Sequence, residues 1–196
     1  MDADAAVLVP VKAFGEAKRR LSPALSGDER AQLSRRLAAG VLAAAAPLPV
    51  AVVCDDREVA GWARGLGALV IWEPGRGLNG AVAAGVAHLV GAGVARVVVA
   101  HGDLARPAVL PSVLDGHPEN GVTLVPDARD DGTNVVVVPA ASAFDFSYGP
   151  GSFRRHLDTA ERLGLVVRLL RGTPLSLDVD VPSDLALSDP AGLVRL

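Results

Sequence analysis

Seven short apolar runs, most of them rich in valine, recur along this chain of 196 residues. Segments whose apolar residues have helical spacing separate most of these runs. Continuous apolar strands that alternate with helices are typical of a mostly parallel sheet covered on both faces, and we therefore predict an α/β protein. The runs are Ala5 to Val11, Val50 to Cys54, Ala68 to Trp72, Arg96 to Ala100, Val122 to Val125, Asn134 to Val138 and Leu165 to Leu170.

Four helices can be placed between the runs. The first has a clear start, because Ser26 and Glu29 form an S-x-x-E capping box ahead of leucines at helical spacing. The others are expected at 57–64, capped by Asp55 or Asp56, at 79–89 and at 152–163. The chain is long enough for one well-buried core and short for two, so we expect a single domain over residues 1–196.

Charge and cysteine content exclude several classes of protein. The formal net charge of −3 gives no overall attraction to nucleic acid. The one cysteine, Cys54, is expected to pack in the core and fits a reducing cytoplasm. The longest apolar run is broken by Pro47 and Pro49 and is shorter than a membrane span, and no signal-peptide pattern is present at the N-terminus. We expect a soluble, cytoplasmic protein that binds neither nucleic acid nor membrane.

The first strand runs directly into a basic loop, VKAFGEAKRRLS, which contains Lys12 and Lys18. Neither the Walker pattern nor G-x-G-x-x-G is present. A phosphate grip made by lysine and arginine side chains is one interpretation of this loop, since such loops hold phosphates at the carboxyl edge of a parallel sheet. A solvated basic turn explains it equally well.

Three aspartates are candidates for a metal site. Asp103 follows the strand RVVVA in VVVAHGDL, where open α/β sheets bind ligands; alternatively it caps a helix that begins near Pro107. Asp178 and Asp180 in SLDVDVPSDL lie two apart in an extended stretch, so their carboxylates project from one side and repel unless a cation lies between them. Mg²⁺ or Mn²⁺ suits such oxygen ligands. An exposed edge strand is the alternative for this pair, and Asp184 is expected to cap the last helix.

Three further residues have both a binding and a structural interpretation. Thr133 opens a strand after Gly132, and its hydroxyl either holds a small acid or completes a turn. Ser152 follows the turn Gly149-Pro150-Gly151 and stands where a helix begins, as an anion site or as a plain N-cap. Asn79 in RGLNGAVAAG begins a helix in the same way. The irregular stretch 139–151 is expected to be a substrate flap.

No nucleophile or general base stands out. The four histidines lack metal-ligand spacing, and no serine lies in a nucleophile elbow. Phosphoryl and nucleotidyl transfers can proceed through positioning and metal electrostatics alone, so their absence favours those reactions.

Six of these motifs, taken in order, resemble a known family. VPVKAFGEAKRRLS, GLNGAVAAG, HGDL, DDGTNVVVV, SYGPGSFRRH and LDVDVPSDL are similar to the 2-phospho-L-lactate or phosphoenolpyruvate guanylyltransferases of coenzyme F-420 biosynthesis, and the likeness spans nearly the whole chain. The resemblance implies a Rossmann-like nucleotidyltransferase fold like that of molybdenum-cofactor guanylyltransferases. It also implies a reaction that joins GTP to a phosphorylated three-carbon acid and releases pyrophosphate.

The resemblance also assigns roles to residues. Asp103, Asp178 and Asp180 look like the Mg²⁺ ligands, and Thr133, Gly149 and Ser152 like the pocket for the acid. Lys12 and Lys18 would face the GTP phosphates, and Asn79 and Gly80 the nucleoside. Two features depart from the pattern: the first loop lacks paired glycines, and Leu104 is followed by Ala105-Arg106-Pro107 where the family has Leu-Pro.

Other functions remain open at this point. The acid could be phosphoenolpyruvate, 2-phospho-L-lactate or 3-phosphoglycerate, which differ by small groups. The next transferase of the pathway is a candidate partner. The alternatives are a nucleotidyltransferase for a sugar phosphate or molybdopterin, and a nucleotide-binding regulator without catalysis.

Overall fold

The computed structural model describes residues 3–140 and 142–188, in which seven strands form one sheet in the order β3-β2-β1-β4-β6-β5-β7. All neighbouring strands are parallel except β6, which is antiparallel to β4 and β5. The mostly parallel α/β sheet predicted from the sequence is therefore confirmed. The strands are β1 (Ala5–Pro10), β2 (Val50–Cys54), β3 (Leu69–Trp72), β4 (Arg96–Ala100), β5 (Gly121–Pro126), β6 (Thr133–Pro139) and β7 (Val166–Leu169).

The antiparallel β6 follows from its short connection to β5. A parallel crossover needs a dozen or more residues, and only residues 127–132 separate the two strands. Asp127 organises this turn, because its Oδ1 accepts hydrogen bonds of 3.0 Å from the backbone N–H groups of Arg129 and Asp131. The sequence pattern did not predict the reversal.

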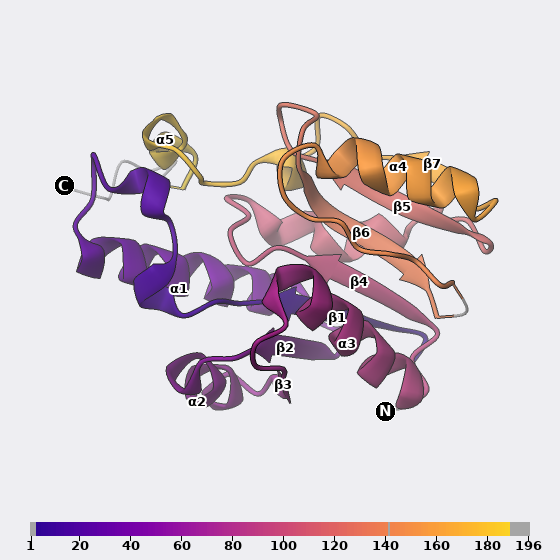
Figure 1. Ribbon diagram of the computed structural model, residues 1–196, viewed down its shortest axis with the longest axis horizontal. Coiled ribbons are helices and arrows are strands. Elements are labelled where there is room, and N and C mark those ends of the chain that lie inside the picture. Colours follow the sequence, from indigo (N-terminus) through magenta and orange to yellow (C-terminus); the bar gives the residue numbers. More distant parts are fainter. Residues whose placement is uncertain (1–2, 141, 189–196) are drawn as a thin grey trace.

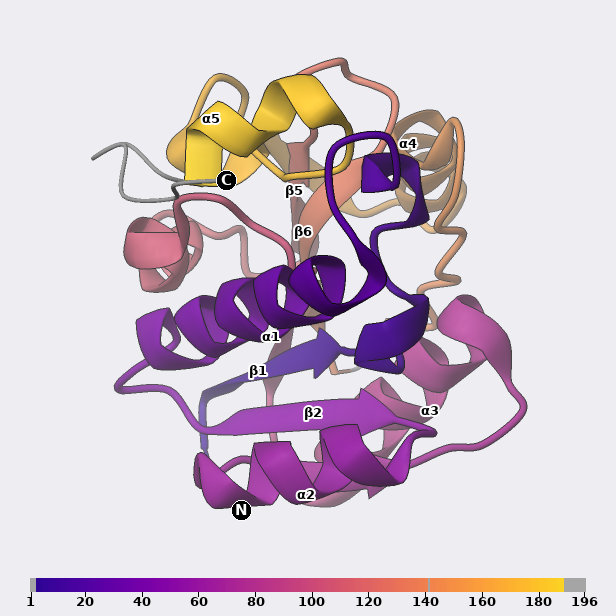
Figure 2. The same cartoon turned by 90° about the vertical axis from the view of Figure 1, so that its left-hand side faces the viewer.

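Helices cover both faces of the sheet (Figures 1 and 2). α1 (Gly27–Ala44), α2 (Arg57–Gly65) and the 3₁₀ segment Pro107–Leu114 pack on one face, and α3 (Gly77–Gly91) and α4 (Ser152–Arg162) pack on the other. Alternation along β1 explains the two layers, since Val7 and Val9 belong to one core cluster and Ala6 and Leu8 to the other. A short helix, α5 (Leu185–Ser188), follows. None of the helices in the described ranges is long and apolar enough to cross a membrane.

Helix starts agree with the sequence in part. The capping box of Ser26 and Glu29 is present, and Asp56 rather than Asp55 caps α2. α3 begins at Gly77, so the expected start at Asn79 was two residues late. Ser152 is the first residue of α4, as expected, and Gly151, with φ of 71°, is its N-cap, so the N-cap alternative for Ser152 is excluded.

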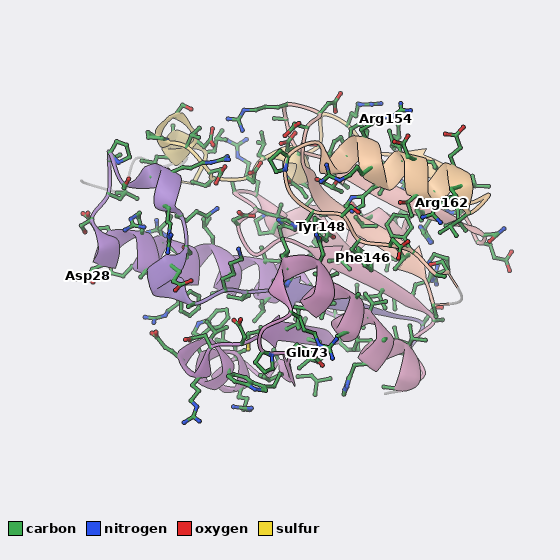
Figure 3. The ribbon with its side chains drawn as sticks, viewed as in Figure 1. Asp28, Glu73, Phe146, Tyr148, Arg154 and Arg162 are labelled. Atoms are coloured by element: carbon green, nitrogen blue, oxygen red, sulfur yellow. The ribbon has the colours of Figure 1, made fainter. Side chains whose placement is uncertain are left out.

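The stretch between β6 and α4 is irregular, as expected, and residue 141 within it lies outside the described residues. Its aromatic side chains Phe144, Phe146 and Tyr148 are buried in the core cluster shared by α3 and α4. Figure 3 shows Phe146 and Tyr148 between these two helices. The proposed role as a substrate flap stays a prediction.

Candidate active site

The candidate site lies where the strand order reverses. β1 is flanked by β2 on one side and by β4 on the other, and ligands of open α/β sheets bind outside the carboxyl ends of the strands at such a switch point. A cavity of about 380 Å³ occupies this position. Its lining includes Lys12 and Lys18 from the loop after β1, Asp103 from the loop after β4, and Asp180 from the C-terminal segment.

The basic loop is fastened to the acidic residues by two ion pairs. Lys18 Nζ lies 2.5 Å from Asp103 Oδ2, and only 8% of the Lys18 side chain is exposed. Arg20 Nη1 lies 2.6 Å from Asp180 Oδ2 on a more exposed surface. In both ribbon views the indigo loop after β1 and the yellow C-terminal segment are side by side (Figures 1 and 2).

Backbone pairing brings the two acidic segments together. The N–H of Val179 donates to the carbonyl of Asp103 at 3.2 Å, and that of Ala105 to Leu177 at 2.8 Å, so Leu104 and Asp178 form an antiparallel bridge. Val179 is fully buried in a small core cluster with Leu21, as expected for an alternating segment whose aspartates face the other way.

These contacts decide two of the alternatives left open by the sequence. Arg106, not Asp103, precedes the 3₁₀ segment at Pro107, and no side chain caps it, so Asp103 is not a helix cap. Asp184 does have the expected structural role, because its Oδ2 accepts hydrogen bonds from the N–H groups of Asp180 and Val181.

Burial and neighbouring charges shift the pKa values of two of the carboxylates in opposite directions. Burial and the neighbouring charge of Asp103 raise the pKa of Asp178 to about 6, although Asn134 Nδ2 donates to it at 3.4 Å. Burial would also raise the pKa of Asp103, but the ammonium of Lys18 and the nearby His101 hold it below its ordinary value. Asp103 lines the cavity, and its charge disfavours the ionised form of Asp178, which is the electrostatic arrangement that a cation relieves.

The residues fit a hard divalent cation in their chemistry. Asp103, Asp178 and Asp180 offer oxygen ligands only, and Asp103 Oδ1 is buried with no hydrogen-bond partner in the described ranges. Over residues 3–140 and 142–188, however, no three His, Cys, Asp or Glu side chains already surround a position for a metal. Lys18 and Arg20 instead provide the positive charge beside two of the three carboxylates.

The residues expected around the acid lie together at the start of α4. Thr133 Oγ1 is 3.0 Å from His156 Nδ1 and accepts a bond of 3.5 Å from Ser152 Oγ, and all three side chains are buried. His156 Nε2 accepts the N–H of Ser147 at 3.0 Å, so we assign the ring proton to Nδ1. Gly149, with φ of 115°, adopts a backbone conformation that favours glycine. The two hydroxyls face this buried network.

Asn79 and Gly80 lie in the first turn of α3. Asn79 Oδ1 accepts the backbone N–H of Tyr148 at 2.7 Å, so it fastens the irregular stretch instead of capping its own helix. Their neighbours Leu78 and Ala81 line a second cavity, also about 380 Å³, which shares Lys12 and Leu78 with the first.

Sequence reasoning missed two residues of the site and the partner of a third. Arg20 was visible within the basic loop, but nothing indicated its partner Asp180. No sequence pattern indicated a role for Asn134 or His101. Asn134 donates a hydrogen bond to Asp178. The ring of His101 lies 4.7 Å from that of Tyr148, and burial lowers the pKa of this histidine.

The fold is shared with solved nucleotidyltransferases. A nucleotidyl transferase of Methanothermobacter thermautotrophicus has the same fold with a TM-score of 0.63 at 18% identity, covering 92% of this chain and 93% of that one. A Desulfovibrio desulfuricans G20 protein assigned as a nucleotide-diphospho-sugar transferase has the same fold, with a TM-score of 0.77 at 17% identity. The match covers 100% of this chain and 91% of that chain.

The chain belongs to the family described as "Guanylyl transferase CofC like", whose model matches residues 5–187. It is 35% identical over 186 residues to the phosphoenolpyruvate guanylyltransferase of Sphaerobacter thermophilus, covering 91% of this chain and 89% of the relative. It is 33% identical over 183 residues to the 2-phospho-L-lactate guanylyltransferase of Methanothermobacter thermautotrophicus, covering 91% of this chain and 81% of that relative. The family expected from the six motifs is thereby confirmed.

Proposed function

We propose that this protein transfers the guanylyl group of GTP to the phosphate of a three-carbon acid, phosphoenolpyruvate or 2-phospho-L-lactate, with release of pyrophosphate, in coenzyme F-420 biosynthesis. Membership in the CofC-like family supports the reaction, and the activities after which the two relatives are named support these two acids. The free, buried Cys54 agrees with a cytoplasmic enzyme.

One observation carries the proposal: lysines and carboxylates from distant parts of the sequence line the same cavity at the switch point. A triphosphate needs cationic side chains beside its leaving phosphates, which Lys12 and Lys18 supply in this proposal. The second cavity, beside Leu78 and Ala81, offers room for the nucleoside next to Asn79 and Gly80.

The reaction is an in-line displacement. An oxygen of the acid's phosphate attacks the α-phosphorus of GTP, a new phosphoanhydride bond forms, and the bond to the β-phosphate oxygen breaks with its electron pair leaving on pyrophosphate. A phosphate monoester has a second pKa of about 6, so the attacking oxygen is already anionic at neutral pH and no general base is required. Lys12 and Lys18 stabilise the departing charge.

Asp103, Asp178 and Asp180 would hold Mg²⁺ or Mn²⁺, which when bound neutralises charge between donor and acceptor phosphates. Thr133, Gly149 and Ser152 would hold the acid at the start of α4. This placement requires the hydroxyls of Thr133 and Ser152 to exchange part of their buried network for the ligand.

Pyrophosphate release tests the proposal. Purified protein with GTP and Mg²⁺ is offered phosphoenolpyruvate, 2-phospho-L-lactate, 3-phosphoglycerate or a sugar phosphate in turn, and then each other nucleoside triphosphate with the preferred acceptor. We expect release with GTP and one of the first two acids. Release only with a sugar phosphate, or GTP binding without turnover, would refute it.

A further inference from the structure

Two basic side chains of the loop after β1 form ion pairs with carboxylates that the proposed function assigns to a metal. Lys18 pairs with Asp103 at 2.5 Å, and Arg20 pairs with Asp180 at 2.6 Å. The Lys18 side chain is 8% exposed and that of Asp103 is 27% exposed, so this pair is largely removed from water. Positive side chains this close would repel a divalent cation that approached the same oxygens.

A buried contact holds the loop after β1 close to Asp103 and Asp180. The basic side chains that reach these carboxylates come from a short turn of that loop. Leu21 is fully buried with Val179, which anchors the loop to the segment that carries Asp178 and Asp180. Lys18 has left-handed backbone angles, φ 56° and ψ 37°, which are uncommon for a residue other than glycine. Its ammonium is thereby held on Asp103 Oδ2, and Oδ1 of the same carboxylate is buried and unpaired in the described part of the chain.

We infer that Lys18 and Arg20 are place-holding cations: they neutralise Asp103 and Asp180 in the free protein, and they exchange these carboxylates for the phosphates of GTP when nucleotide and divalent cation bind together. The inference rests on the proposed function, because it needs the metal and GTP to share this cavity. It assigns Arg20 to the site and gives Lys18 a second partner. The phosphates draw the ammonium and guanidinium away, and the carboxylates become free for the metal.

Such an exchange couples the two ligands thermodynamically. The free protein binds the metal weakly, because the metal competes with Lys18 and Arg20. Once phosphates hold those side chains the competition ends, so GTP increases metal affinity and, by linkage, the metal increases GTP affinity by the same factor. Couplings of this kind amount to roughly 5- to 150-fold.

The test is a calorimetric titration with Mn²⁺, with and without saturating GTP and with no acceptor acid, on the wild type, Lys18→Gln and Arg20→Gln. We expect Lys18→Gln to raise the Mn²⁺ affinity of the free protein at least about fivefold and to weaken GTP binding, so that the coupling factor shrinks. Arg20→Gln should act in the same direction by about twofold, since its ion pair is exposed.

The matched control is Arg19→Gln, which removes the same charge from the same turn at a side chain with no ion pair in the described residues. This control separates the effect of the Lys18 ion pair from that of a general change in charge. Lys18→Arg keeps a positive charge beside Asp103 and should retain the wild-type coupling between GTP and Mn²⁺. Thermal unfolding of each variant, with and without Mn²⁺, shows whether it is folded. For Lys18→Gln we expect a larger rise in Tm with Mn²⁺ than for the wild type, because Asp103 is left without its cation.

The results separate the two levels of inference. Equal or weaker Mn²⁺ binding by free Lys18→Gln, or an unchanged coupling factor in a protein that turns over GTP and an acid, would overturn place-holding and leave the proposed function intact. A wild type that binds no Mn²⁺ with or without GTP would refute the proposed metal site and the place-holding inference together.

Discussion

Acidification should weaken the folded protein through His156, whose ring is buried beside Thr133 and receives the N–H of Ser147. Burial, with smaller contributions from the charges of Arg155 and His101, lowers the pKa of His156 from 6.5 to about 4. Between these two pH values the His156 ring is therefore protonated in the unfolded chain and neutral in the folded protein. The stabilising contribution is complete above pH 6.5 and is lost as the pH falls toward 4.

The magnitude follows from the two pKa values. A pKa difference of one unit is worth ~1.4 kcal/mol, so the contribution lost is roughly 2 kcal/mol at pH 5 and roughly 3 kcal/mol near pH 4. Asp178 acts in the opposite direction, because its raised pKa favours the folded state as the pH falls. The pH dependence of the wild type alone is thus a sum, and only a comparison with a variant isolates His156.

Urea unfolding of the wild type and His156→Gln at pH 7 and pH 5 provides that comparison. The glutamine can still accept from Ser147 but does not titrate, so the stability difference between the two proteins should shrink by about 2 kcal/mol at the lower pH. His88→Gln, at an exposed position on α3, is the control for loss of a histidine. A difference that is the same at both pH values would show that the buried ring is not kept neutral in the folded protein.

Three further predictions concern the site and the sheet. Asp103→Asn should lower Tm, because it leaves the largely buried Lys18 ammonium without its counter-charge, but should keep the protein folded at assay temperature. It should reduce pyrophosphate release by at least about a hundredfold, because the proposed site loses charge balance; near-normal Mg²⁺-dependent rates in the folded variant would contradict the assignment. Ser152→Ala should raise KM for the acid several-fold and leave KM for GTP unchanged, and equal effects on both substrates would exclude Ser152 from the acid pocket. Gly121→Ala should lower stability by more than about 3 kcal/mol in urea unfolding, because a Cβ there would lie 2.2 Å from the carbonyl oxygen of Val166, whereas Gly61→Ala on α2 has open space and should be stabilising; similar curves for both would refute this.

Local sequence determined much of the architecture. The valine-rich runs predict all seven strands. The five inner strands are apolar along most of their length because they are buried on both faces, whereas β3 and β7 lie at the sheet edges and are partly exposed. The capping box of Ser26 and Glu29 predicts the start of α1 because both of its hydrogen bonds join residues three apart. Ordered motifs were also sufficient to identify the family.

Other features depended on tertiary structure. The N-cap of α4 and the partner of Asn79 depend on contacts with distant segments, and the sequence pattern did not decide them. Likewise, Lys18 and Asp103 are 85 residues apart along the chain, and only the order of the strands brings them together. The reversal of β6 follows instead from its short connection to β5, which the strand pattern by itself does not encode. Hydrophobic periodicity acts over a few residues, whereas charge pairing and burial depend on which chain segments the folded sheet places side by side.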